Sequence, residues 1–137
     1  MQIEQIAARI QAANLGTFGT DLFANNMPAT VSEGIIVLPN LSGNVIDWEL
    51  GPNWRNNAGF QIVVRAPMGK YREGYNLATS VAAVMTITQD TVIPAINPDI
   101  PSVTIRYCRP KHDIISYPRS QTGLVEFSMN FEMAYHK

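Results

Sequence analysis

The residues of this chain that could carry out chemistry are few, and their spacing does not match a catalytic site. His112 is followed directly by Asp113, but neighbouring side chains rarely point at each other in an extended chain. The other histidine is His136, and Cys108 is the single cysteine. Two histidines and one cysteine lack the pattern of a metal site, and an enzyme needs several groups that converge on one reacting atom. The sequence therefore predicts a protein that is not an enzyme, with no catalytic residue, metal site or cofactor.

Signatures of nucleotide and nucleic-acid binding are also missing. The segment 16–19 lacks the rest of a dinucleotide fingerprint, and the chain contains no GK[ST] phosphate loop and no nucleophile elbow. Arg106 and Tyr107 alternate faces of a strand instead of sharing one, unlike the aromatic and basic residues of RNA-binding sheets. The formal net charge of −1 argues against a protein that grips nucleic acid or an anionic membrane through its overall charge.

Two tryptophans and an arginine are the strongest candidates for contacts with other proteins. Trp48, Trp54 and Arg55 lie in a long, mostly polar segment, 41–57. Loops of this length are often functional, and Trp and Arg dominate the energetics of protein interfaces. The alternative is that one tryptophan packs on the core of its own domain. We expect these three residues to contact a neighbouring subunit or another assembly component.

A second set of candidates lies in the segment 111–123, which has the one concentration of basic residues in the chain. It contains Lys111, His112 and Arg119. Because an isolated charged residue is usually a solvated surface residue, these positions are secondary to the tryptophans. We expect them to face either a neighbouring subunit or the interior of an assembly.

The length and composition of the chain predict one soluble domain that spans residues 1–137. The chain is 46% apolar, which is ordinary for a globular protein with a single core. One cysteine excludes an internal disulfide. No apolar run with a basic flank opens the sequence and none is long enough to span a bilayer, so we expect no membrane association and synthesis in a cytoplasm.

The rest of the chain is organised around a strand and the helix that follows it. Residues 60–66 contain an unbroken apolar run that predicts a buried strand, and Pro67 and Gly69 end it. From residue 70 the apolar period becomes that of a helix, which we expect to continue to Met85. Gly74 lies inside this pattern, where it costs about 1 kcal/mol relative to Ala unless another group approaches closely.

Further periodic segments complete the predicted fold. Helical spacing predicts a helix over 2–14, and β-type patterns predict strands over 33–38, 102–109 and 124–135. The segments 16–32, 41–57, 89–101 and 111–123 are expected to be loops, with a hint of a short strand near Val45 and Ile46. In the last strand, alternate residues from Val125 to Tyr135 are apolar, which predicts one buried and one wet face. The prediction is an α+β domain: a mostly antiparallel sheet of about four main strands with two helices on one face, in the order α-β-β-α-β-β.

The order and spacing of four segments resemble those of a known protein family. The segments are a short N-terminal helix that leads into GTFGTDLFANNMP, the central stretch FQIVVRAPMGKYREGYNLATSVAAVM, the strand and polar loop YCRPKHDIISYPRSQTG, and the final strand LVEFSMNFEMAY. Together they span most of the chain. They resemble the small tail terminator proteins of tailed bacteriophages, also called minor capsid or head-to-tail joining proteins.

This resemblance implies a structural role in the virion. Such proteins form a ring, expected to be hexameric, on the head-proximal end of the tail tube, where they stop tube polymerisation and join the tail to the head connector. The implied partners are further copies of this chain, the tail tube protein and the connector or adaptor protein. The implied location is the neck of the virion, after assembly in the host cytoplasm. DNA would pass through the ring without sequence-specific binding.

The physical properties of the chain are compatible with this role. A long last strand and long loops can dock between neighbours in a closed ring. Near-neutral charge suits a channel that DNA must traverse without sticking. Two alternatives remain: another neck or tail-completion protein, such as a stopper or a tube subunit, and a small non-enzymatic α+β module that binds a peptide or ligand.

Overall fold

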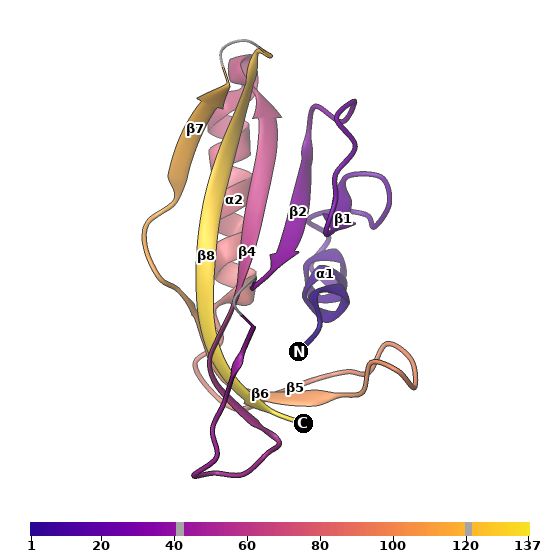
Figure 1. Ribbon diagram of the computed structural model, residues 1–137. Helices are drawn as coiled ribbons and strands as arrows, with labels where there is room; N and C mark the ends of the chain where they lie inside the picture. Colours follow the sequence, from indigo (N-terminus) through magenta and orange to yellow (C-terminus); the bar gives the residue numbers. More distant parts are fainter. Residues whose placement is uncertain (41–42, 120–121) are drawn as a thin grey trace.

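Two long antiparallel strands, β4 (Trp54–Pro67) and β8 (Leu124–His136), form the centre of the protein. The computed structural model describes residues 1–40, 43–119 and 122–137. In it, β4 and β8 pair along their whole length, from Trp54 opposite His136 to Pro67 opposite Leu124, with a bulge between Arg55 and Ala58. Figure 1 shows this pair running from one end of the molecule to the other. All other strands are added to its two edges.

The sheet is larger than the sequence predicted. In the described residues it has eight strands, and its main order is β1-β2-β4-β8-β6-β5. The added strands are β1 (Leu22–Ala24), β2 (Gly34–Pro39), β3 (Val45–Ile46), β5 (Thr91–Ile93), β6 (Val103–Pro110) and β7 (Ile115–Arg119). β3 pairs with one end of β4 and β7 with one end of β8, while β1 runs parallel to β2. The sheet is therefore mixed.

The prediction of a mostly antiparallel sheet of about four main strands was wrong, although the α+β class is compatible with the structure. Three short strands lie inside segments that were expected to be loops: β1 within 16–32, β5 within 89–101 and β7 within 111–123. Each has only three to five residues. A run this short shows no clear periodicity, and its strand conformation comes from pairing with a longer neighbour. Residues 41–42, part of the predicted loop 41–57, lie outside the described residues.

Both edges of the last strand are occupied within the chain. β4 covers one edge of β8 from end to end. On the other edge, β7 pairs with residues 124–128 and β6 with residues 131–136, and the Lys111 N–H between them donates to the Asn130 carbonyl at 2.8 Å. The last strand was expected to dock between neighbours, but the described residues leave it no free edge for strand pairing. A contact through its outer face stays a prediction.

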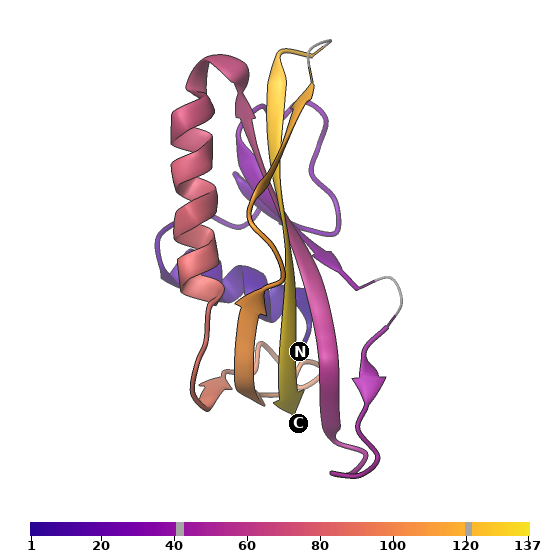
Figure 2. The same ribbon diagram turned by 90° about the vertical axis from the view of Figure 1, so that its left-hand side faces the viewer.

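Two helices cover the inner face of this sheet. α2 (Tyr71–Met85) follows β4 through a short 3-10 turn, η1 (Met68–Lys70), and lies against β4 and β8. Figure 2 shows α2 on one side of the central strands, parallel to their long axis. α1 (Ile3–Ala12) packs against β1, β2 and α2. The buried side chains of both helices join one core with the inner residues of the sheet.

The periodicity of β8 predicted its inner face correctly. The alternate side chains from Val125 to Tyr135 are all buried in the core. The opposite face is less wet than expected, because Ser128 is buried and the other outward residues of β8 are half-buried. Polar pairs account for this burial. For example, the Gln61 side-chain amide donates to the Ser128 hydroxyl at 2.8 Å.

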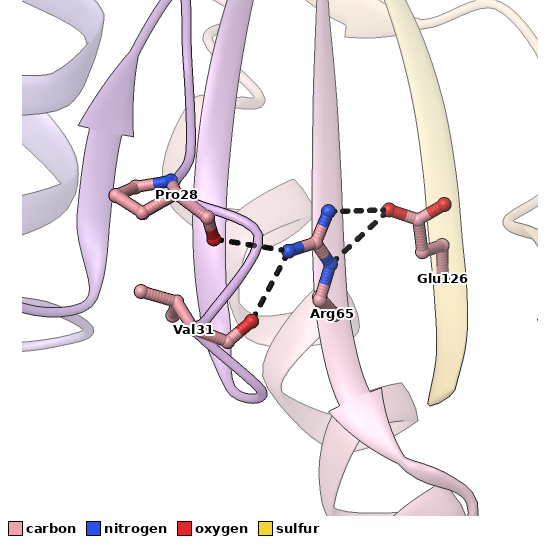
Figure 3. A network of polar contacts seen from close by, with 4 residues as sticks. All are labelled: Pro28, Val31, Arg65 and Glu126. Carbon is pink, nitrogen blue, oxygen red and sulfur yellow. Dashed lines mark hydrogen bonds and ion pairs between the residues drawn. The ribbon is translucent and has the colours of Figure 1, made fainter. Parts of the chain in front are cut away.

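An arginine network ties the loop before β2 to this outer face. Arg65 of β4 forms an ion pair with Glu126 of β8 at 3.3 Å, and these side chains are only 18% and 13% exposed. The same guanidinium donates to the carbonyl oxygens of Val31 at 3.1 Å and Pro28 at 3.5 Å. Figure 3 shows the guanidinium between the loop and β8. One side chain thus holds three separate segments together.

Candidate protein-interaction site

The predicted loop with two tryptophans is an ordered β-hairpin made by β3 and β4. Val45 pairs with Asn56 and Ile46 with Arg55. The Asp47 N–H continues the ladder by donating to the Trp54 carbonyl at 3.1 Å. A carboxylate oxygen of Asp47 accepts from the backbone N–H groups of residues 49 and 50, which is the usual way that Asp stabilises a tight turn. The hairpin extends to one end of the molecule (Figure 1).

The tip of this hairpin exposes large apolar side chains. Trp48 is 72% exposed and Leu50 is 60% exposed, and Val45 on β3 is exposed as well. The carboxylates of Asp47 and Glu49 flank Trp48 in the sequence. Exposed apolar side chains gathered at one site are typical of a surface that binds another protein. Trp48 does not pack on the core of this chain.

Trp54 has a different environment, because it is half-buried against the ends of β6 and β8. Its ring centroid lies 4.4 Å from that of His136, and the Arg106 guanidinium carbon lies 5.5 Å from the Trp54 ring. Arg106 also forms an ion pair with Asp90 at 2.7 Å. Trp54 is thus supported by its own sheet without being part of the buried core.

A hollow lies beside Trp54, and it is named here the Trp54 hollow. Its lining residues are Asp47, Leu50, Trp54, Arg55, Asn56, Arg106 and Ala134. The Arg55 guanidinium donates to the carbonyl oxygens of Pro52 at 2.7 Å and Trp54 at 3.1 Å. The guanidinium has five N–H donors, so these two bonds leave it further capacity to bind. The hollow therefore combines apolar walls with a cation.

The three basic candidates do not join this surface. Lys111 is exposed beside Asn130, near the middle of β8, and Arg119 ends β7 opposite Leu124. Trp54 pairs with His136 at the other end of β8. The three β8 residues that these candidates lie beside, 124, 130 and 136, are six residues apart. Six residues of a strand span about 20 Å. The six candidates therefore occupy three separate levels along β8. Of Arg119 the structure describes the backbone, and its side chain lies outside the described part of the chain.

His112 has a local structural role. Its Nδ1 lies 2.7 Å from the Asp113 carbonyl oxygen, so Nδ1–H donates this bond, and its Nε2 accepts from the Asn130 side-chain amide at 2.9 Å. The ring is half-buried and both nitrogens are engaged. The pairing fixes the chain between β6 and β7. Asp113 contributes its backbone carbonyl to this arrangement, which is not the geometry of a histidine–carboxylate catalytic pair.

A second exposed loop was missed as a candidate. After β5 the chain makes a turn over residues 94–101, named here the Ile96 turn, in which residues 94–99 are exposed and Ile96 is 46% exposed. Its base is held by Gln5 of α1, whose buried side-chain amide donates to the carbonyl oxygens of Pro94 at 3.1 Å and Pro101 at 2.9 Å. The three prolines of this segment marked a loop, but no local pattern showed that a helical glutamine would hold it.

The described residues contain little that could support catalysis. No group of three or more His, Cys, Asp and Glu side chains in them is placed to hold a metal ion. Burial raises the pKa of Cys108 to about 12, and the positive charge of Arg9 opposes this only in part. A thiol in that state is a poor nucleophile. Within the same residues, no helix combines the length and apolarity that crossing a membrane requires.

Comparison with protein families identifies the family of this chain. A search among curated proteins found no match. A family model described as "Bacteriophage tail terminator protein" matches residues 9–137, nearly the whole chain, including both central strands, α2, the β3–β4 hairpin and the Ile96 turn. The resemblance noted in the sequence is thereby confirmed, and the chain belongs to the bacteriophage tail terminator family of structural tail proteins.

Proposed function

We propose that this protein forms a ring on the head-proximal end of a phage tail tube, where it stops tube polymerisation and joins the tail to the head connector. The observation that carries the proposal is the family match over residues 9–137. The expected ring is a hexamer of this single-domain chain, located in the neck of the virion. Its partners would be further copies of the chain, the tail tube protein and the connector.

The geometry supports contacts of this kind. A subunit that must bind a tube, a connector and its neighbours needs several separate surfaces, and the candidate residues occupy three levels along β8. The tip of the β3–β4 hairpin is the most exposed apolar feature and lies at one end of the molecule (Figure 1). We assign Trp48 to the contact with the tube end. Lys111, His112 and Arg119 are second candidates, for a neighbour or for the channel.

Passage of DNA is consistent with the charge of the chain. The formal net charge is −1, and four cations form ion pairs within the described residues: Arg65, Lys70, Arg106 and Arg109. Paired cations attract phosphates less than isolated ones do, so a channel lined by this protein would not retain DNA.

Electron microscopy of the protein mixed with tail tubes tests this proposal. We expect a ring at one end of each tube and arrest of further growth when tube subunits are added. Trp48→Ser should lower the fraction of capped tubes by about tenfold or more, because an exposed aromatic anchor often carries over 1.4 kcal/mol of binding free energy. Phe18→Ser is the matched control, since Phe18 is also exposed but lies outside the hairpin.

Other outcomes separate the alternatives. Long tubes formed by this chain alone would identify a tube subunit instead. Binding to the connector without binding to tubes would identify a stopper. Uncapped tubes that keep growing beside a folded protein would refute the terminator function.

A further inference from the structure

The Ile96 turn is a rigid projection, although it has no helix or strand of its own. The Ile96 N–H donates to the Ile100 carbonyl at 3.0 Å. The Asn97 side-chain oxygen accepts from the backbone N–H groups of Asp99 at 2.9 Å and Ile100 at 3.0 Å. The turn thus satisfies much of its own backbone and presents Ile96 and Asp99 to solvent. A surface that is ordered before it binds loses little conformational entropy on binding.

Gln5 fixes the direction in which this turn projects. Its side chain is 1% exposed, and its amide group bonds both ends of the turn. A buried amide without partners costs about 1–3 kcal/mol, so the two ends of the turn are held together as long as α1 stays in place. The turn is therefore part of the folded body and not a loose loop. That is the property expected of a docking element.

The Trp54 hollow offers complementary chemistry. Its walls include the apolar surfaces of Leu50, Trp54 and Ala134, and Arg55 supplies a cation for which the described residues show no carboxylate partner. The other charged groups of the lining are Arg106, which pairs with Asp90, and Asp47, whose carboxylate accepts the two N–H bonds of its turn and keeps its negative charge. The lining thus contains two guanidinium groups and one carboxylate.

The Ile96 turn combines apolar surface with a negative charge. It presents an exposed isoleucine and Asp99, whose carboxylate has no ion-pair partner in the described residues. The turn and the hairpin that borders the hollow project in different directions from the same end of the molecule (Figures 1 and 2). One chain thus presents an apolar, anionic projection on one side and an apolar, cationic hollow on another.

We propose that the Ile96 turn of one copy docks in the Trp54 hollow of the next copy, with Ile96 against the apolar walls and Asp99 paired with Arg55. This inference rests on the proposed ring and names its subunit contact. Two different surfaces joined in this way make a head-to-tail contact, which closes into a ring when the rotation between copies is right. The full pairing of β8 supports it, because neighbours cannot associate by extending the central strands.

Cross-linking of the full chain tests the contact directly. Ile96→Cys and Leu50→Cys place one thiol on the turn and one beside the hollow, and Cys108 is buried and stays unreactive. The two variants are mixed with a short bis-maleimide, both free at about 100 µM and bound to tail tubes. We expect cross-linked dimers containing one copy of each variant. Phe18→Cys mixed with Leu50→Cys is the control, and it should give at least tenfold less product.

Charge exchange supplies an independent test. Asp99→Arg and Arg55→Asp should each weaken association between copies by about fivefold or more, measured by sedimentation velocity and by ring occupancy on tubes. The double variant should recover to within about twofold of the original, because the ion pair is restored with its charges exchanged. Arg72→Glu, which reverses an exposed cation on α2 outside all the candidate surfaces, should have little effect.

The outcomes distinguish this inference from the proposed function. Specific dimers and charge rescue without any capping of tubes would support the contact and refute the terminator function. Capped tubes without cross-links, and without rescue by the double variant, would keep the function and overturn the contact. If Ile96→Asp abolished capping while association between copies was unchanged, the turn would bind the tube instead, which also overturns the inference.

Discussion

Replacement of Gly74 by Ala is expected to destabilise this protein, although the same change stabilises most helices. Gly74 is the fourth residue of α2. A Cβ built there would lie 2.7 Å from Cε2 of Phe127 and 2.8 Å from Cβ of Ala66. Favourable carbon–carbon contacts are about 3.5–4.0 Å, so the methyl group would be about 1 Å too close on two sides. The helix can approach the sheet this closely because residue 74 has no side chain.

The contacts around Gly74 set the expected loss of stability in Gly74→Ala. Ala in place of Gly in a helix contributes about 1 kcal/mol, whereas overpacking a core costs about 1–3 kcal/mol. Phe127 cannot easily move, since it is fully buried and its ring packs against those of Tyr71 and Tyr75, at centroid distances of 5.1 and 6.0 Å. The Ala66 Cβ is bonded directly to the β4 backbone, so it cannot move aside by rotation of a side chain. We therefore take the upper half of the overpacking range, which leaves a net loss of about 1–2 kcal/mol.

Thermal unfolding followed by circular dichroism measures this loss. At about 2.1 cal/mol/K per residue, a loss of 1–2 kcal/mol lowers Tm by about 3–7 °C. Gly69→Ala is the matched control, because a Cβ there meets nothing within 4 Å. That variant should be neutral or gain up to about 1 kcal/mol through the unfolded state. A Tm that rises in Gly74→Ala as much as in Gly69→Ala would refute the close approach of α2 to the sheet.

Three further predictions concern stability and assembly. Arg65→Met should lower the free energy of unfolding in urea by about 2–4 kcal/mol, because it removes a largely buried ion pair. Arg109→Met removes a more exposed pair and should cost clearly less, and equal losses in the two variants would contradict the reasoning. Because the pKa of Cys108 is raised by burial from 9.0 to about 12, folding favours the protonated thiol, so this stabilisation is complete below pH 9 and is lost as the pH rises toward 12. At pH 10 the loss should be about 1 kcal/mol relative to pH 8, and Cys108→Ala should lack this component. Parallel pH profiles of the two proteins would contradict this prediction. Trp54→Ala should leave a folded monomer by circular dichroism but weaken ring formation, and a variant that unfolds would instead make Trp54 essential to the core.

The structure brings some of the candidate residues together and separates others. A tryptophan beside an arginine in a long polar segment indicated an interface, and the structure places Trp54 and Arg55 at one hollow with Trp48 at the exposed tip of the same hairpin. Whether these surfaces bind partners stays a prediction. The segment 111–123 was less informative, because basic residues close in sequence lie far apart once β7 folds back along β8.

The Ile96 turn could not be recognised as a docking element from the sequence. Its prolines indicated a loop, but its rigidity depends on Gln5, nearly 90 residues earlier in the chain. A polar residue in a helix is normally assigned to the solvent face. The burial of Gln5 follows from where α1 lies relative to β5 and β6, which is a property of the tertiary structure.

The sequence by itself determined the elements that are long enough to show a period. The alternation in 124–135, the apolar run in 60–66 and the stripe from Tyr71 to Met85 correspond to β8, the second half of β4 and α2. These patterns recur over many residues because one face of each element is buried. They also set the α+β class, and the order of segments indicated the family that the model comparison confirmed.

Only the tertiary structure decided the size of the sheet and the position of the surfaces. β1, β5 and β7 are strands because a longer strand supplies their hydrogen bonds, and their own residues carry no such signal. In the same way, Gly74 is required by the proximity of Phe127 and Ala66, which come from two other elements. Local patterns record which face of an element is buried, whereas pairing and close packing depend on residues that are distant in the sequence.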